Sequence, residues 1–174
     1  SSMNKNIFLT ASVEGESGTI QKTSKKDGLV ESNAWRGYGI RNGIGVEVLK
    51  FTQFSLSHTL VNLRSGESSL ENLTGSRLAA EIAFSFSAPI TNIQFGLGIL
   101  ADQLQYQANL KSATFIGSGR YYSMGFNYFF SPSISLQATG KRMEANNNVS
   151  GGSSDINRIK AQTNNLSLGI AIWL

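Results

Sequence analysis

The chain has 174 residues, a net charge of +4, 40% hydrophobic and 15% charged residues, and no cysteine. Soluble domains usually carry about 25% charged residues, so this composition has too few charges for a disordered polyelectrolyte and too few long apolar segments for a helical membrane bundle. The lack of cysteine excludes disulfides, thiol catalysis and cysteine zinc sites, and the single histidine, His58, argues against a histidine-rich metal site.

The amino terminus carries no apolar stretch of the kind found in export signals. We therefore expect either a cytosolic chain or a mature form whose signal has been removed. Ser1-Ser2-Met3 is interpreted as a tag remnant, which makes residues 1–5 a tail and residues 6–174 a single domain.

The first predicted strand begins at Ile7, where apolar and polar residues alternate as far as Glu14. Two further strands follow, and two turns between them are possible. A turn at Arg41-Asn42-Gly43 would put Lys50 on an apolar face, whereas a turn at residues 50–52 leaves Lys50 in the turn. We prefer the second, with strands at about 38–48 and 53–63, although it places Asn42 and His58 on the apolar face.

Two stretches without any charged residue follow, at 82–101 and 121–140, and each holds one of the two prolines, Pro89 and Pro132. Proline flanked by serine or asparagine predicts a turn. On both sides of each proline the apolar residues recur with a period of two, which predicts two tight hairpins. A last alternating segment, residues 165–174, brings the total to eight strands.

The second face of these strands is built of small polar residues instead of the charged residues that face water in soluble sheets. An apolar outer face with small polar residues on the inner face suits a closed barrel in lipid. In lipid the backbone N–H and C=O groups of an edge strand would find no hydrogen-bond partner, so the sheet must close. Short turns at 50–52, 88–92 and 131–133 alternate with polar connections at about 15–33, 64–76, 107–117 and 145–157, which predicts long loops at one end. The predicted fold is all-β, an eight-stranded antiparallel up-and-down transmembrane β-barrel.

With this pattern the chain resembles the small eight-stranded outer-membrane proteins, a group that includes the OmpA transmembrane domain, OmpX and NspA. Such proteins end in an alternating strand with a carboxyl-terminal aromatic residue that the barrel-assembly machinery reads. Here residues 166–174 alternate in the same way, but the aromatic residue, Trp173, is penultimate. The resemblance implies an outer-membrane location with both termini in the periplasm.

Charged residues on the inner face form the main candidate site, a polar network in the lumen made of Arg41, Glu47, Glu81, Asp102 and Lys141. An eight-stranded barrel is just wide enough for side chains to fill it, and opposite charges there should pair. We interpret this network as a plug that closes the barrel. A gated conduit for small ions, as the resemblance to the OmpA class suggests, is the alternative.

His58 is the one side chain able to act as a base at neutral pH, so a hydrolase would have to use it. Lipid A deacylases of the PagL type carry a His-x-Ser pair, but Leu60 stands at the serine position. PagP-type palmitoyltransferases use histidine, serine and aspartate residues dispersed along the chain, and such a set is not excluded by spacing. We expect His58 to lie in the barrel wall near the membrane interface and the protein to be no enzyme.

Three lysines, Lys22, Lys25 and Lys26, lie in the first predicted loop and are candidates for contact with lipopolysaccharide phosphates. Nucleic-acid binding is disfavoured because the aromatic residues are not interleaved with basic ones. Aromatic residues at strand ends are expected to form girdles at the membrane surfaces: Trp35, Tyr38, Tyr106, Tyr121, Tyr122, Tyr128, Phe129, Phe130 and Trp173.

The sequence thus predicts a monomeric, non-enzymatic barrel of the Gram-negative outer membrane, acting through its outer loops or as a structural component. A narrow pore for small solutes and a lipid A modifying enzyme are the alternatives. No cofactor and no metal are expected. The expected partners are outer-membrane lipid, lipopolysaccharide and, during biogenesis, the barrel-assembly machinery.

Overall fold

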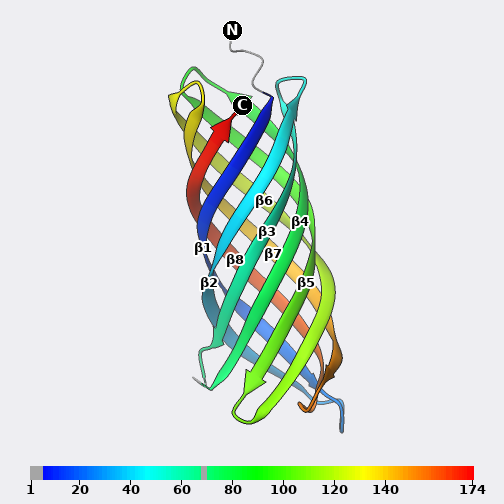
Figure 1. Ribbon diagram of the computed structural model, residues 1–174. Coiled ribbons are helices and arrows are strands. Elements are labelled where there is room, and N and C mark those ends of the chain that lie inside the picture. Colours follow the sequence, from blue (N-terminus) through cyan, green and yellow to red (C-terminus); the bar gives the residue numbers. More distant parts are fainter. Residues whose placement is uncertain (1–5, 68–69) are drawn as a thin grey trace.

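The computed structural model describes residues 6–67 and 70–174 as eight antiparallel strands closed into a barrel (Figure 1). The predicted fold class is confirmed, whereas the tail interpretation of residues 1–5 falls outside the described residues. Within those residues no helix is long and apolar enough to cross a membrane. The strands are β1 (Ile7–Ser24), β2 (Val30–Val48), β3 (Thr52–Ser65), β4 (Glu71–Ser87), β5 (Thr91–Ala108), β6 (Lys111–Ser131), β7 (Ile134–Gly152) and β8 (Ile156–Trp173).

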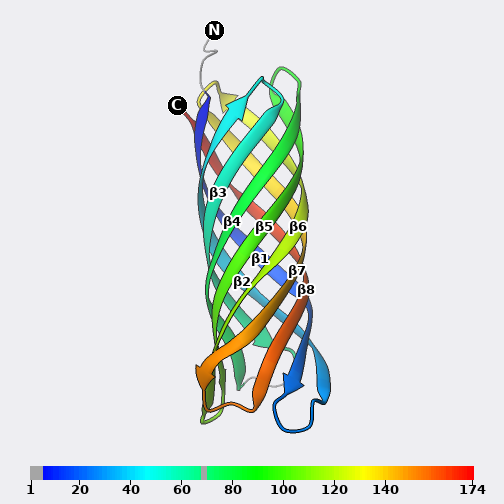
Figure 2. The ribbon, with the colours of Figure 1, turned by 90° about the vertical axis from the view of Figure 1, so that its right-hand side faces the viewer.

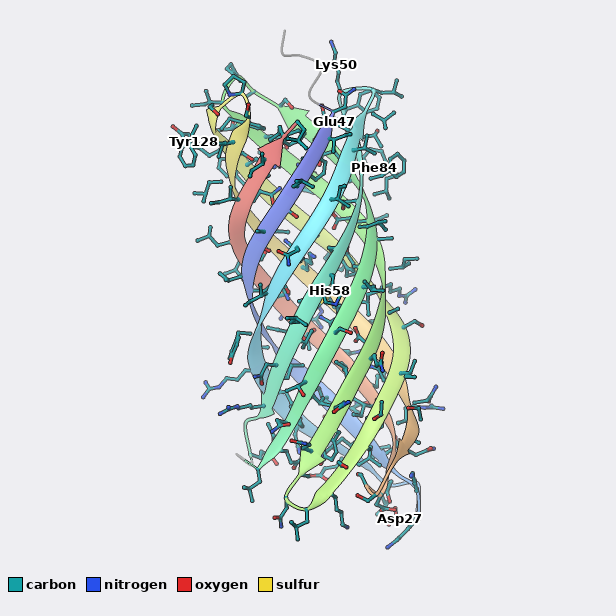
Figure 3. All side chains as sticks on the ribbon, viewed as in Figure 1. Asp27, Glu47, Lys50, His58, Phe84 and Tyr128 are labelled. Carbon is teal, nitrogen blue, oxygen red and sulfur yellow. The ribbon has the colours of Figure 1, made fainter. Side chains whose placement is uncertain are left out.

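Closure joins the first strand to the last. Strand β1 pairs with β2 on one side and with β8 on the other, from Phe8 opposite Trp173 to Ser24 opposite Ile156. Each strand therefore has a hydrogen-bonded neighbour on both sides. The strands are steeply tilted, and the start of β1 and the end of β8 lie at one end of the barrel, called here the terminal end (Figures 1 and 2). The opposite end, where Asp27 lies in Figure 3, is called the distal end.

The turn between β2 and β3 is at residues 49–51, close to the preferred sequence interpretation. Leu49 and Lys50 both have positive φ, at 57° and 68°, which gives the backbone the twist that tight hairpins favour. Arg41, Asn42 and Gly43 lie inside β2 and pair with Thr59, His58 and Ser57 of β3. The alternative turn is therefore wrong.

The long polar loops predicted at the distal end are also wrong. Most of residues 15–33, 64–76, 107–117 and 145–157 belong to strands, and the connections there are only residues 25–29, 66–70, 109–110 and 153–155. In these segments polar residues stand at the outward positions, where the alternation in the terminal half has apolar residues. They are nonetheless fully paired, as in β5 and β6, which stay in register from Asp102 opposite Gly117 to Ala108 opposite Lys111.

The physical reason is that each strand exchanges the polarity of its two faces along its length. In β5, apolar side chains from Ile93 to Ile99 point outward, but beyond Asp102 the outward residues are glutamines and the buried ones are Leu104 and Tyr106. The backbone alternation continues without a bulge through this point. A prediction that follows a single apolar face therefore ends the strand too early, at the point where the apolar residues pass to the other face.

The outer wall of the terminal half is a continuous apolar band. Phe84 and Tyr128 project outward near the terminal end in Figure 3. In most strands the band covers about 7–11 residues, for example residues 7–13 of β1 and 38–48 of β2, close to the 9–11 residues of a tilted transmembrane strand. Its exposed members include Leu9, Val13, Ile40, Ile44, Val46, Phe54, Leu56, Leu60, Leu78, Phe84, Ile93, Phe95, Leu97, Ile99, Met124, Phe126, Leu136, Leu166, Leu168, Ile170 and Ile172.

The aromatic residues predicted for the girdles fall into two groups, one on the outer wall and one inside the barrel. Tyr38, Tyr122, Tyr128 and Phe130 are exposed on the outer wall, as a girdle requires. The girdle prediction is wrong for Trp35, Tyr106, Tyr121 and Trp173, which are buried in the barrel. Inside the distal half, Trp35 and Tyr106 join other apolar residues in a core like that of a soluble barrel: Ile20, Trp35, Val61, Leu63, Leu73, Leu104, Tyr106, Ala113, Phe115 and Ile159.

A pair of substitutions in β5 tests where the lipid ends. Leu97→Arg puts a charge in the apolar band and should lower the free energy of unfolding by about 2–4 kcal/mol in lipid vesicles. Gln107→Arg, on the same wall of the same strand but farther from the band, should change it by less than about 0.5 kcal/mol because its surroundings are aqueous. Equilibrium urea unfolding measures both, and equal costs would contradict a membrane boundary between them.

Candidate functional site

The charged side chains inside the barrel are the main candidate site. Among the buried and half-buried side chains that the structure describes, the inward positions carry four cations and six carboxylates, so the positive net charge of the protein lies outside the lumen. The cations are Lys22, Arg41, Arg77 and Lys141, and the carboxylates are Glu14, Glu16, Glu47, Glu71, Glu81 and Asp102.

Arg77 of β4 makes the most extensive ion pair. Its Nε and one terminal nitrogen donate to both oxygens of Asp102 on the adjacent strand, at 2.8 and 3.2 Å. The other terminal nitrogen donates to Glu16 Oε1 across the lumen at 2.9 Å. Two parallel hydrogen bonds to one carboxylate form the strongest arrangement available to arginine. All three side chains are buried, and they bridge the barrel where the polarity of the strands changes.

Arg41 of β2 forms a second ion pair, with Glu14 of β1 at 3.3 Å. The same arginine donates to Ser167 Oγ at 3.3 Å, and Asn165 donates to the second oxygen of Glu14 at 2.6 Å. This group therefore connects three strands, β2, β1 and β8. It shares no residue with the Arg77 group, so neither arginine depends on the other's carboxylates.

Glu81 and Lys141 belong to a third group. Ser123 donates to Glu81 at 2.9 Å, and the Lys141 ammonium lies 4.8 Å from the centre of the Tyr121 ring, within reach of a cation–π interaction. The Tyr121 ring lies against Gly98, where any side chain would overlap it. A Cβ at this position of β5 would force the ring to move, so the glycine leaves room for the ring to lie across the lumen.

The five predicted lumen residues all face inward, but they do not form one network. Asp102 pairs with Arg77, Arg41 pairs with Glu14, and Glu81 and Lys141 lie near Tyr121. Glu47 lies apart near the terminal end (Figure 3), where it accepts a hydrogen bond from Gln53 at 3.1 Å. Three clusters and a residue at the rim replace the single network.

Sequence reasoning missed three partners of this site, Glu14, Glu16 and Arg77. The sequence interpretation ended the first strand at Glu14 and put Glu16 in the following loop, although both continue the inward alternation of Thr10 and Ser12. Arg77 continues the inward alternation of Glu81 and Ala79. Extending the period of two beyond the apolar residues would have found all three.

The remaining lumen is filled toward both ends. At the terminal end, the Trp173 ring packs at a tilt against Phe8 and Phe129, with ring centres 4.8 and 5.7 Å away. At the distal end, Lys22 is buried, pairs with Glu71 at 2.5 Å and lies over the Tyr106 ring. Lys22 is therefore not available for lipopolysaccharide, which corrects that expectation, whereas Lys25 and Lys26 are exposed in the β1–β2 turn.

His58 lies on the outer wall, inside the apolar band between Leu56 and Leu60 (Figure 3). Its cross-strand neighbours are Asn42 and Leu78, so no carboxylate stands beside it to orient the ring. Elsewhere in the described ranges, no three histidine, aspartate or glutamate side chains gather to hold a metal ion. Neither a hydrolytic triad nor a metal site is assembled around this residue.

No sequence profile of a protein family and none of the curated proteins matches the chain. Solved structures do match its fold. Neisserial surface protein A is 13% identical with a TM-score of 0.60 over 94% of this chain and 97% of that one. The N-terminal β-barrel domain of OprF from Pseudomonas aeruginosa is 12% identical with a TM-score of 0.61 over 94% and 97%.

An enzyme is also among the matches. The outer membrane protease OmpT from Escherichia coli is 9% identical, with a TM-score of 0.51 over 99% of this chain and 98% of that one. At such low identity these similarities establish the fold and leave the activity open. The closed ladder, the apolar outer band and these matches lead to one conclusion: the chain has the fold of the small outer-membrane β-barrel proteins.

Proposed function

We propose that the protein is an integral outer-membrane barrel that is not an enzyme, whose lumen is sealed and whose role is structural or depends on its distal surface. The observation that carries this proposal is the combination of an apolar outer band with a filled interior. Aromatic rings, ion pairs and the distal apolar core occupy successive levels of the lumen. The cavity beside Arg41, Glu81 and Lys141 has about 50 Å³, room for a few water molecules.

The proposed orientation places both termini in the periplasm. In support, the apolar band reaches the turns at the terminal end, whereas the distal strands project beyond it as a polar wall. Outer-membrane barrels have short periplasmic turns and extend further on the outer side. Lys25 and Lys26 would then face lipopolysaccharide, and the alternating last strand would serve the assembly machinery. The closed ladder leaves no edge for another copy, which favours a monomer.

Conductance distinguishes the sealed barrel from a pore. The purified protein in planar lipid bilayers should give no channel steps above the bare membrane, because charged and apolar side chains close the lumen. Steps that appear with the wild-type protein and disappear with Glu81→Ala would show that the lumen conducts and would overturn the proposal.

The Arg77 cluster should act as a structural plug. Arg77→Ala leaves Asp102 and Glu16 buried without a cation, and we expect it to lower the free energy of unfolding by about 3–5 kcal/mol. Arg120→Ala is the matched control, because its guanidinium pairs with Glu144 at 3.7 Å but is 82% exposed, against 7% for Arg77. The control should cost less than about 1 kcal/mol. Urea unfolding in vesicles measures both, and similar costs would refute the plug.

Lipid analysis tests the absence of enzymatic activity. Cells with and without the protein should yield lipid A of the same mass, because His58 faces the hydrocarbon without an acidic partner. A change in acyl chains that depends on the protein and disappears with His58→Ala would establish the lipid A modifying alternative.

A further inference from the structure

Two arginines lie directly opposite each other on the outer wall, Arg36 of β2 and Arg64 of β3. Both are exposed, and neither makes an ion pair with any side chain that the structure describes. Their lateral neighbours, Ser17 of β1 and Asn72 of β4, are uncharged. Like charges at directly opposite positions of an antiparallel pair destabilise a sheet, so this pair is unfavourable without an anion.

The arginine pair lies at the height where lipid phosphates are found. Tyr38, 62% exposed, is two residues from Arg36, and Leu60 marks the edge of the apolar band on β3. Two residues along a strand span about 6.6 Å. The headgroup layer outside the hydrocarbon core is about 5–8 Å deep on each side. A guanidinium pair one step beyond the tyrosine therefore meets the phosphate layer.

A groove of about 610 Å³ begins at Tyr38 and Asn62, two residues along each strand from the arginines, and is lined by β2, β3, β4 and β5. Small residues of β4, Gly75 and Ser76, lie along it, and its walls change in character along its length. Ile40 and Leu60 are apolar and lie in the band, whereas Asn62, Thr74, Gln103 and Gln105 are polar and lie beyond it. The groove thus offers an apolar wall to an acyl chain and amide donors to a headgroup.

We propose that Arg36 and Arg64 bind the phosphate of one anionic lipid, whose acyl chain lies in this groove. The inference rests on the membrane placement proposed above. Two guanidinium groups bound to one phosphate change their mutual repulsion into two charge-assisted contacts. Arg120 and Arg142 are a second basic pair on the outer wall, but both have partners within the protein. Arg120 pairs with Glu144, and Arg142 donates to Asn164 at 3.1 Å.

Lipid titration followed by native mass spectrometry tests this site. The full chain in maltoside micelles is titrated with phosphatidylglycerol, which carries the phosphate without assuming which leaflet meets the distal end. One lipid should be retained, and Arg36→Gln/Arg64→Gln should weaken its binding about tenfold or more. The matched control Arg120→Gln/Arg142→Gln removes the same charge and should change binding less than threefold. Equal weakening in the two double variants would overturn the site.

The source of the phosphate is tested in the same titration. Phosphatidylcholine, which has no net charge, should bind the wild-type protein about tenfold more weakly than phosphatidylglycerol. Inorganic phosphate at millimolar concentration should not displace the lipid. Equal binding of the two lipids, or displacement by inorganic phosphate, would contradict an anionic-lipid site.

Thermal unfolding gives an independent test, because a variant that only damages the barrel would lower the unfolding midpoint. In lipid-free micelles Arg64→Gln should raise the unfolding midpoint by about 1–3 °C, because it removes repulsion, and phosphatidylglycerol should then raise it less than in the wild type. A lower midpoint without lipid would contradict the proposal. If the variants insert into vesicles as compact barrels but bind lipid like the control, the site is wrong and the membrane proposal still holds.

Discussion

The hydrogen-bonded ladder between β1 and β8 is the constraint on which the rest of the structure depends. A backbone amide in hydrocarbon has no water to bond with, so a sheet in lipid is stable only when its first and last strands pair. This pairing runs from Phe8 opposite Trp173 at the terminal end to Ser24 opposite Ile156 at the distal end. Because closure continues along the whole strand, the barrel keeps its shape beyond the apolar band, where water would tolerate an open edge.

A change of solvent along the barrel determines what fills it. Where the outer wall is apolar, the interior beyond the aromatic rings of the terminal end is mostly polar, and its buried charges must pair, as Arg77 does with Asp102 and Glu16. Where the outer wall carries glutamine and asparagine, the interior is apolar, with Phe115 fully buried. Burial of apolar area against water supplies a driving force there that lipid does not provide in the terminal half. The Arg77 cluster lies at the junction of these two regimes.

The sequence interpretation was accurate where one pattern persisted and wrong where it changed. The eight strands, the turn near Lys50 and the outward position of His58 follow from alternation alone. The long distal loops were inferred because glutamine, asparagine and serine are typical of loops, and Gln103, Gln105 and Gln107 break the apolar stripe of β5. The same error removed Glu16 and Lys22 from the lumen and placed Trp35 and Tyr106 in a membrane girdle.

In the segments where the alternation was followed, the sequence by itself determined the side of each residue, because the period of a strand is two and a side chain cannot change face without a bulge. It therefore determined that Arg41, Glu47, Glu81, Asp102 and Lys141 point inward. Only the tertiary structure decided which of these charges meet. Partners such as Glu16 and Arg77 are 61 residues apart and come together across a closed lumen. Their pairing depends on the stagger between all eight strands, which no local pattern contains.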